Sequence, residues 1–259
     1  MASAIAGAKE GGTILLTDDI TLDESLTIEG DVTLDLNGNS ITGATAKTDA
    51  LLVNDGTLTI VGGTIENTAV NGGAAISNIG TLTLADVTVQ GGAMDASGYP
   101  AYTVVTSGDL TIEEGTTILA NRGALSLSNG AEVVINGGEL IVSDAADGRN
   151  MTLHTIYAYG YDSVLTINDG YFEQGHSSTG GASVICPAGA KINIYGGTFY
   201  DPMDDSDWRN TANFQNYMGY GVKLNVCGGT YSDKSVEKNV AEGYEAVANG
   251  DGTYTVQAK

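Results

Sequence analysis

The chain is expected to fold as an all-β solenoid: a right-handed, single-stranded parallel β-helix of about 8–9 coils, with a short N-terminal helical cap and a C-terminal hairpin cap. Three features lead to this expectation. A short motif recurs eight times, apolar residues alternate within each copy, and 37 glycines punctuate the 259 residues. One copy cannot bury its apolar face alone, but stacked copies can, because equivalent strands pair in parallel and like side chains form internal ladders.

The repeat is an aliphatic–x–aliphatic step followed by a turn, usually at glycine, and then another apolar residue. Its copies are LDLNGNSI (34–41), LTIVGGTI (58–65), LTLADVTV (82–89), LTIEEGTTI (110–118), VVINGGEL (133–140), LTINDGYF (165–172), INIYGGTF (192–199) and LNVCGGTY (224–231). The second aliphatic residue serves as a marker, 23 to 32 residues apart, at Leu36, Ile60, Leu84, Ile112, Ile135, Ile167, Ile194 and Val226. Period-two alternation predicts strands with one face directed inward, and parallel crossovers are almost always right-handed.

The two ends of the chain are expected to cap the coils, because an exposed strand edge promotes aggregation. The whole chain, 1–259, is expected to be one domain. Residues 1–11 are expected to form the N-terminal cap, with a short Ala-rich helix at residues 2–9, and residues 12–232 are expected to form the coils. Residues 233–259 form the C-terminal cap, with a helical turn followed by a hairpin at a Gly-Asp-Gly turn.

The charge balance argues against two classes of partner. The chain has 32 acidic and 10 basic residues, for a net charge of −22. Such a chain repels nucleic acid, and its basic residues form no cluster along the sequence that could bind anionic lipid. No apolar run reaches the ~18 residues that span a bilayer, and the first residues lack the features of a secretory signal. We therefore expect no nucleic-acid partner and no membrane partner.

Cysteine and histidine residues are few. Cys186 and Cys227 are too few for a disulfide scaffold, and they can either form one bridge or be buried as small apolar thiols. His154 and His176 have no cysteine or acidic partner at metal-ligand spacing, so no zinc site is expected.

Three segments carry a resemblance to a known group of proteins. They are DITLDESLTIEGDVTLDLNGNSITG (19–43), the recurring GGTI, GGTF and GGTY turns, and GGTYSDKSVEKNVAEGYEAVANGDGTYTV (228–256). In these segments the chain resembles the pectate-lyase-like right-handed β-helix modules of gut bacterial surface proteins and bacteriophage structural proteins. The resemblance implies the fold. Because this superfamily contains lyases, glycosidases, adhesins and virion parts, it does not select one function.

The outward positions of the expected strands lack the groups of an enzyme. Catalysis on this fold would need a calcium-held carboxylate cluster with a basic proton acceptor, or paired carboxylates on adjacent coils. The outward positions are instead mostly threonine: Thr33, Thr59, Thr83, Thr111, Thr166, Thr64, Thr88, Thr198 and Thr230. We therefore predict no catalytic residues, no cofactor and no enzymatic activity.

One acidic segment, DPMDDSDWRN (201–210), is a candidate calcium site. Asp201, Asp204, Asp205 and Asp207 offer hard oxygen ligands. Their spacing matches neither an EF-hand loop nor a calcium-binding β-helix repeat. A solvated acidic loop is the interpretation that we favour.

Tyrosines provide a candidate contact surface. All 13 tyrosines follow residue 98, and Tyr157, Tyr159 and Tyr161 alternate along one expected strand, so their rings should share a face. An exposed face of this kind could stack on sugars or anchor a protein, whereas an inward face would fill a wider coil. Longer insertions, where binding determinants are expected, occur at 91–102, 143–150 and 201–219.

Three functions are compatible with these features. The first, which we expect, is a non-catalytic structural, decoration or attachment module of a bacteriophage virion, such as a capsid decoration, head fibre or tail component. Such a protein assembles in the host cytoplasm and needs no export signal. The second is a domain excised from a bacterial cell-surface adhesin, and the third is a polysaccharide lyase or glycoside hydrolase. Expected partners are other virion or surface proteins, with a glycan and a homo-oligomer as further candidates.

Overall fold

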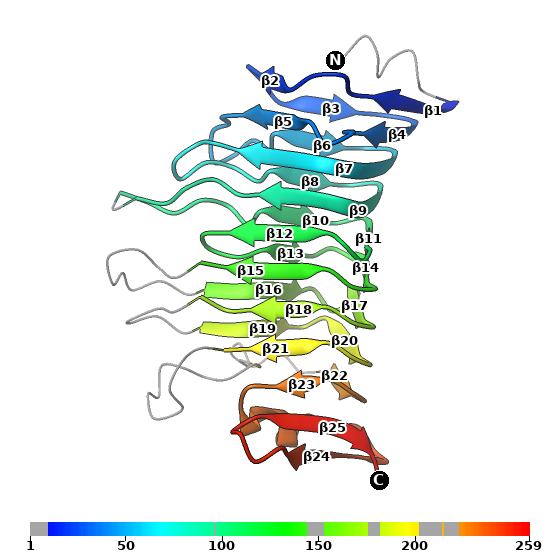
Figure 1. Cartoon of the computed structure of the whole chain (residues 1–259), viewed down its shortest axis with the longest axis vertical. Helices are drawn as coiled ribbons and strands as arrows, with labels where there is room; N and C mark the ends of the chain where they lie inside the picture. The colour runs from blue at the N-terminus through cyan, green and yellow to red at the C-terminus, as the bar shows by residue number, and fades with distance from the viewer. Residues whose placement is uncertain (1–9, 96, 144–152, 176–181, 202–213, 215–222) are drawn as a thin grey trace.

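The computed structural model describes residues 10–95, 97–143, 153–175, 182–201, 214 and 223–259 (Figure 1). Within them the chain is all-β, with an 18-stranded sheet and a seven-stranded sheet. The strands stack along the long axis of the molecule from the N-terminal to the C-terminal end. These strands pair in parallel except at the C-terminal end, where β25 pairs antiparallel with both β23 and β24.

The strands lie in three rows, which the chain visits in turn. The first row contains β1 (Glu10–Leu15), β4 (Asp31–Asp35), β7 (Thr57–Asn67), β9 (Thr81–Gln90), β11 (Asp109–Ile112), β14 (Glu132–Ile135), β17 (Val164–Ile167), β20 (Lys191–Ile194) and β22 (Lys223–Val226). The second row contains β2 (Ile20–Leu22), β5 (Ser40–Gly43), the later halves of β7 and β9, β12 (Thr117–Ala120), β15 (Glu139–Val142), β18 (Tyr171–Glu173), β21 (Thr198–Tyr200) and β23 (Thr230–Tyr231). The third row is the seven-stranded sheet: β3 (Leu26–Ile28), β6 (Leu52–Asn54), β8 (Ile76–Asn78), β10 (Val104–Thr106), β13 (Leu125–Leu127), β16 (Leu153–Tyr159) and β19 (Ala182–Ala188).

Seven of the predicted aliphatic markers form one continuous ladder in the first row, together with Leu34. Its members are Leu34, Ile60, Leu84, Ile112, Ile135, Ile167, Ile194 and Val226. All of these side chains are fully buried. Seven of the eight marker positions are therefore confirmed, and the ladder places the core between the rows.

The first marker assignment is wrong. The repeat predicted Leu36 as the counterpart of Ile60, whereas Ile60 pairs with Leu34, two residues earlier. The following strand, β5, is back in register with β7. The turn between β4 and β5 is therefore longer than the corresponding turn inside β7, and Asn37 and Gly38 allow this because both have positive φ angles, 51° and 80°.

The inner ladder of the second row changes from aliphatic to aromatic toward the C-terminal end. Phe199 stacks on Phe172 and on Tyr231, with ring centres 4.8 Å apart in both pairs and interplanar angles of 10° and 4°. This distance equals the spacing of neighbouring strands, so the rings stack without disturbing the backbone. The Tyr231 hydroxyl donates to the carbonyl oxygen of Gly228 at 2.8 Å, which satisfies the one polar group of the stack.

Buried polar residues also form a ladder, at the ends of third-row strands. Asn54 donates through Nδ2 to Oδ1 of Asn78 at 2.7 Å, and Asn78 donates through Nδ2 to Oγ1 of Thr106 at 2.9 Å. All three side chains are buried. Each amide thus bridges two rungs and satisfies polar groups that would otherwise destabilise the core.

The helical turn and the hairpin that were predicted near the C-terminus are both present. A 3₁₀-helix, η2 (Lys234–Lys238), starts after Asp233, whose side chain accepts a hydrogen bond from the backbone N–H of Ser235. Strands β24 (Tyr244–Ala248) and β25 (Tyr254–Ala258) form the hairpin, and β25 pairs with β23, the last strand of the second row. At the other end, the predicted helix of residues 2–9 lies outside the described residues, and β1 already begins at Glu10, inside the predicted cap 1–11.

Candidate functional site

The described connections between the second and third rows lie along one edge of the molecule, which we call the loop edge (Figure 1). The connection between β9 and β10, in which all residues but 96 are described, is the longest of the described connections. It projects from the end of β9. Hydrogen bonds hold this connection against the preceding one. Asn71 donates through Nδ2 to Oδ1 of Asp95 at 2.7 Å, and the backbone N–H of Ser97 donates to the same oxygen at 2.7 Å.

Two basic side chains lie against the tyrosines of this connection. Lys47 Nζ is 3.4 Å from the centre of the Tyr99 ring, and Arg122 Cζ is 4.4 Å from the same centre and 5.2 Å from the centre of the Tyr102 ring. Arg122 also donates through Nη1 to the carbonyl oxygen of Pro100 at 3.4 Å. A cation over an exposed tyrosine face is stabilised by about 0.5–1 kcal/mol. We call Lys47, Tyr99, Tyr102 and Arg122 the cation–tyrosine cluster.

The tyrosines predicted as a contact surface continue from this cluster. The ring centre of Tyr157 is 6.1 Å from that of Tyr102 and 6.1 Å from that of Tyr159, whose ring is within 5° of parallel. Tyr157 is half-buried and Tyr159 is exposed, so this pair shares an outward face. The predicted strand does not reach Tyr161, because β16 ends at Tyr159 and Gly160, with a φ of 94°, turns the chain before the exposed Tyr161.

A buried polar pair lies next to these tyrosines. His154 Nδ1 and Ser183 Oγ are 2.8 Å apart. The pKa of His154 is lowered to about 4, mainly by burial and secondly by the positive charge of Arg122. Its ring is therefore neutral at pH 7. Gly123 is needed beside it, because a Cβ there would lie 2.2 Å from Cε1 of Tyr102 and 2.6 Å from the carbonyl oxygen of His154. The Tyr102 ring therefore packs directly on the backbone.

The His154–Ser183 pair has the spacing of a base and a nucleophile. However, the exposed fractions of the two residues are 2% and 0%, so a substrate has no access to them in this conformation. In the structure Nδ1 of His154 and Oγ of Ser183 satisfy one another inside the core.

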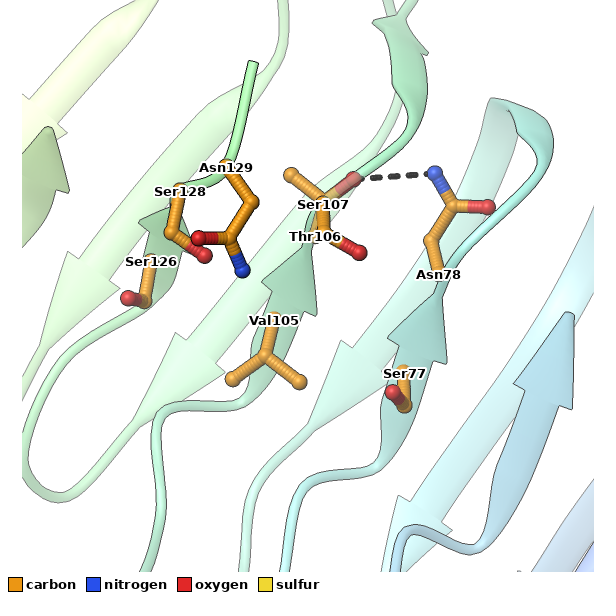
Figure 2. Close-up of a pocket in the computed structure, with 8 residues that line it drawn as sticks. All are labelled: Ser77, Asn78, Val105, Thr106, Ser107, Ser126, Ser128 and Asn129. Atoms are coloured by element: carbon orange, nitrogen blue, oxygen red, sulfur yellow. Dashed lines mark hydrogen bonds between the residues drawn. The ribbon is translucent and has the colours of Figure 1, made fainter. Parts of the chain in front are cut away.

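A shallow groove of about 170 Å³ lies on the outer face of the third row (Figure 2). Ser77, Val105 and Ser126 occupy equivalent positions on β8, β10 and β13. The remaining lining residues are Asn78, Thr106, Ser107, Ser128 and Asn129. This lining can form hydrogen bonds, but it contains no acid, base or charged group that would perform chemistry on a ligand.

The predicted calcium ligands are not brought together among the described residues. Asp201 is buried, while Asp204, Asp205 and Asp207 lie outside the described residues. Where the chain is described, no group of three or more His, Cys, Asp or Glu side chains could hold a metal ion.

The two cysteines are free thiols. Cys186 lies on β19 in the third row, and Cys227 follows β22 in the first row. Burial raises the pKa of Cys186 to about 12, so this thiol is protonated and unreactive at neutral pH. Of the two alternatives that the sequence left open, the structure has unbridged thiols.

The cation–tyrosine cluster was not found from the sequence. We expected the basic residues to form no cluster, yet Lys47 and Arg122 meet at the Tyr99 ring because the connections before β6, β10 and β13 stack at the loop edge. The only signal in the sequence was indirect: residues 91–102 form one of the longer insertions, and such insertions carry binding determinants.

No protein-family model, curated protein or solved structure matches the chain. In the described part of the chain, no helix is long and apolar enough to cross a membrane.

Proposed function

We propose that the chain is a right-handed, single-stranded parallel β-helix of about 8–9 coils, related to the pectate-lyase-like modules that its sequence resembles. The order of the strands supports this architecture. The chain passes from the first row to the second, then to the third, and returns to the first row beside its earlier strand. Parallel connections of this kind are right-handed in almost all proteins.

We further propose that this β-helix is a non-catalytic structural or attachment module of a bacteriophage virion, with its loop edge facing a partner. The observation that carries the proposal is the outer face of the first row. Thr33, Thr59, Thr83 and Thr111 lie in register there, all partly exposed. This face suits a stable β-surface but presents no positioned acid or base.

The filled core supports a role as a rigid support. Stacked aliphatic and aromatic ladders fill the core between the described strands, which suits attachment better than turnover. The net charge of −22 would keep closely spaced copies from adhering to one another or to nucleic acid. Both properties fit a protein displayed in many copies on a particle.

The location can be tested by immunogold electron microscopy with an antibody raised against the purified chain. Phage particles and washed bacterial cells from the source culture are labelled in parallel. We expect gold on the particles. Labelling of the cell envelope with unlabelled particles would contradict the virion proposal and favour the adhesin.

The absence of catalysis can be tested on polysaccharides. We expect no unsaturated products and no new reducing ends from polygalacturonate or from neutral glycans, with or without calcium. Calcium-dependent turnover that is lost in Asp204→Ala or Asp205→Ala would overturn the non-catalytic assignment.

A further inference from the structure

We propose that Lys47 and Arg122 bind carboxylates of an acidic segment on a protein partner. This inference rests on the proposed attachment function of the loop edge and specifies the chemistry of the partner. Four properties of the cation–tyrosine cluster support it: the position of its two charges at one ring, their lack of carboxylate partners among the described residues, the N–H donors that they offer, and the aromatic surface beside them.

The two positive charges lie close together. Lys47 Nζ and Arg122 Cζ are 3.4 Å and 4.4 Å from the centre of the same Tyr99 ring. Among the described residues, no carboxylate forms an ion pair with either side chain. The ring attracts both cations but carries no net charge, so their mutual repulsion remains. An anion bound beside them would relieve that repulsion.

This lack of partners is notable because the chain has 32 acidic residues and only 10 basic ones. Asp95, in the same connection as Tyr99, accepts hydrogen bonds from Asn71 and Ser97 and so holds the connection in place. Over distances longer than about 8 Å, the repulsion of an acidic ligand by the rest of the chain is screened at physiological salt. The cluster can therefore act as a local anion site on an acidic protein.

The contacts of Tyr99 favour a carboxylate over a neutral sugar. Stacking on a sugar requires a free ring face, and a sugar would have to compete for the 42%-exposed Tyr99 ring with the two cations that lie against it. The groups left to contact a partner are N–H donors. A guanidinium has five, of which Arg122 uses one for the carbonyl oxygen of Pro100, and the Lys47 ammonium has three. Hydrogen bonds from such donors to a carboxylate are about twice as strong as neutral ones.

The surroundings favour a protein as the source of the carboxylates. Tyr and Arg are the residue types that contribute most to protein interfaces, and Tyr157 and Tyr159 extend the cluster along the third row. From the connection before β6 to β16 the surface covers four strand spacings, roughly 20 Å. An extended peptide of about six residues spans that length.

The test uses a fluorescein-labelled peptide of about eight glutamates, a length that slightly exceeds this surface. A glutamine peptide of the same length controls for charge, and a galacturonate oligomer of similar length supplies carboxylates on a glycan. Binding is measured by fluorescence anisotropy and, for the unlabelled oligomer, by competition. The variants are Lys47→Gln and Arg122→Gln. Lys191→Gln, an exposed cation on the first row, is the matched control.

We expect the glutamate peptide to bind at least about tenfold more tightly than the glutamine peptide, and each cluster variant to weaken it about tenfold, or about 1.4 kcal/mol. Lys191→Gln should bind like the unmodified chain. Equal binding by all four proteins, or an equal loss in Lys191→Gln, would overturn the site. Tighter binding of the galacturonate oligomer would overturn the assignment to a protein partner. The unfolding midpoint of each variant is measured as well, and an unchanged midpoint shows that a loss of binding is not caused by a loss of fold.

The outcome is separable from that of the proposed function. Gold-labelled particles combined with no peptide binding would reject the carboxylate site and leave the virion module standing. Peptide binding that depends on Arg122, combined with envelope labelling, would support the carboxylate site and reject the virion location.

Discussion

In the first row of strands each inward side chain meets a similar side chain one rung away, whereas at the loop edge the cations contact a residue of a different kind. Leu58 pairs in register with Leu82, and both are buried. Tyr99, by contrast, contacts Lys47 and Arg122, which come from connections before two other strands of the third row. The first arrangement repeats with the chain, and the second occurs once.

This difference separates stability from recognition. The ladders of the rows remove large apolar areas from water, at about 25 cal/mol per Å², and so supply most of the folding free energy. The contacts of the loop edge are partly exposed and contribute about 0.5–1 kcal/mol each. Substitutions at the loop edge should therefore alter binding with little effect on the fold, and substitutions in the rows should do the reverse.

Leu58→Asp should produce the largest effect. The side chain is 1% exposed, so the variant places an unpaired carboxylate inside the ladder and should lower the free energy of unfolding by about 5 kcal/mol or prevent folding. Urea unfolding followed by circular dichroism measures the change. The control is Thr59→Asp, one residue later and facing outward, where a change within about 1 kcal/mol is expected. Similar losses in both variants would contradict the assignment of inward and outward positions.

Phe199→Ala should be nearly as disruptive. It removes the middle ring of the stack between Phe172 and Tyr231 and leaves a cavity, at a cost of about 4 kcal/mol. The neighbouring Tyr200→Ala serves as its control, because Tyr200 is exposed and should change the free energy of unfolding by less than about 1 kcal/mol. A loss below about 1 kcal/mol in Phe199→Ala would show that the aromatic ladder does not support the C-terminal end.

His154 should make stability depend on pH. Its pKa is lowered from 6.5 to about 4 in the folded chain, mainly by burial, so the unfolded chain takes up the proton first as the pH falls. The neutral His154 ring therefore contributes about 3 kcal/mol to the free energy of unfolding. This contribution is complete above pH 6.5, declines between pH 6.5 and 4, and changes no further below pH 4. Because carboxyl groups also titrate at the acidic end, the measured quantity is the difference in unfolding free energy between the unmodified chain and His154→Gln. A difference that stays constant from pH 7 to about pH 4 would contradict a buried neutral imidazole.

Gly123→Ala should affect the junction between the rows and the loop edge. The new methyl group would overlap the Tyr102 ring and the carbonyl oxygen of His154, which should cost about 2 kcal/mol and displace the ring. Near-ultraviolet circular dichroism of the tyrosines reports the displacement, and urea unfolding reports the energy. Gly130→Ala is a suitable comparison for added volume, because nothing lies within 4 Å of a Cβ there, although its φ of 84° makes some backbone strain inevitable. An unchanged tyrosine signal in Gly123→Ala would contradict the close packing of Tyr102.

The sequence predicted the rows far better than the loop edge, for a physical reason. Period-two alternation places Ile60 and its counterparts inside, whatever the length of the turn that follows. Among the markers only Leu36 was misplaced. The turn after β4 is longer than its counterparts, and Leu34 and Leu36 have the same aliphatic–x–aliphatic spacing as the repeat. The C-terminal hairpin was also predictable from its Gly-Asp-Gly turn. The meeting of Lys47 and Arg122 was not, because it depends on how non-repeating connections stack, which no local pattern encodes.

The most direct test combines stability and binding in one variant, Lys47→Gln together with Arg122→Gln. Removing the cation–π contacts should lower the free energy of unfolding by less than about 2 kcal/mol. Anisotropy with the glutamate peptide on the same samples should show binding reduced at least as much as in either single variant. That result would assign stability to the strand rows and recognition to the loop edge. A double variant that unfolds several kcal/mol more easily, or that binds the peptide as well as the unmodified chain, would contradict this division.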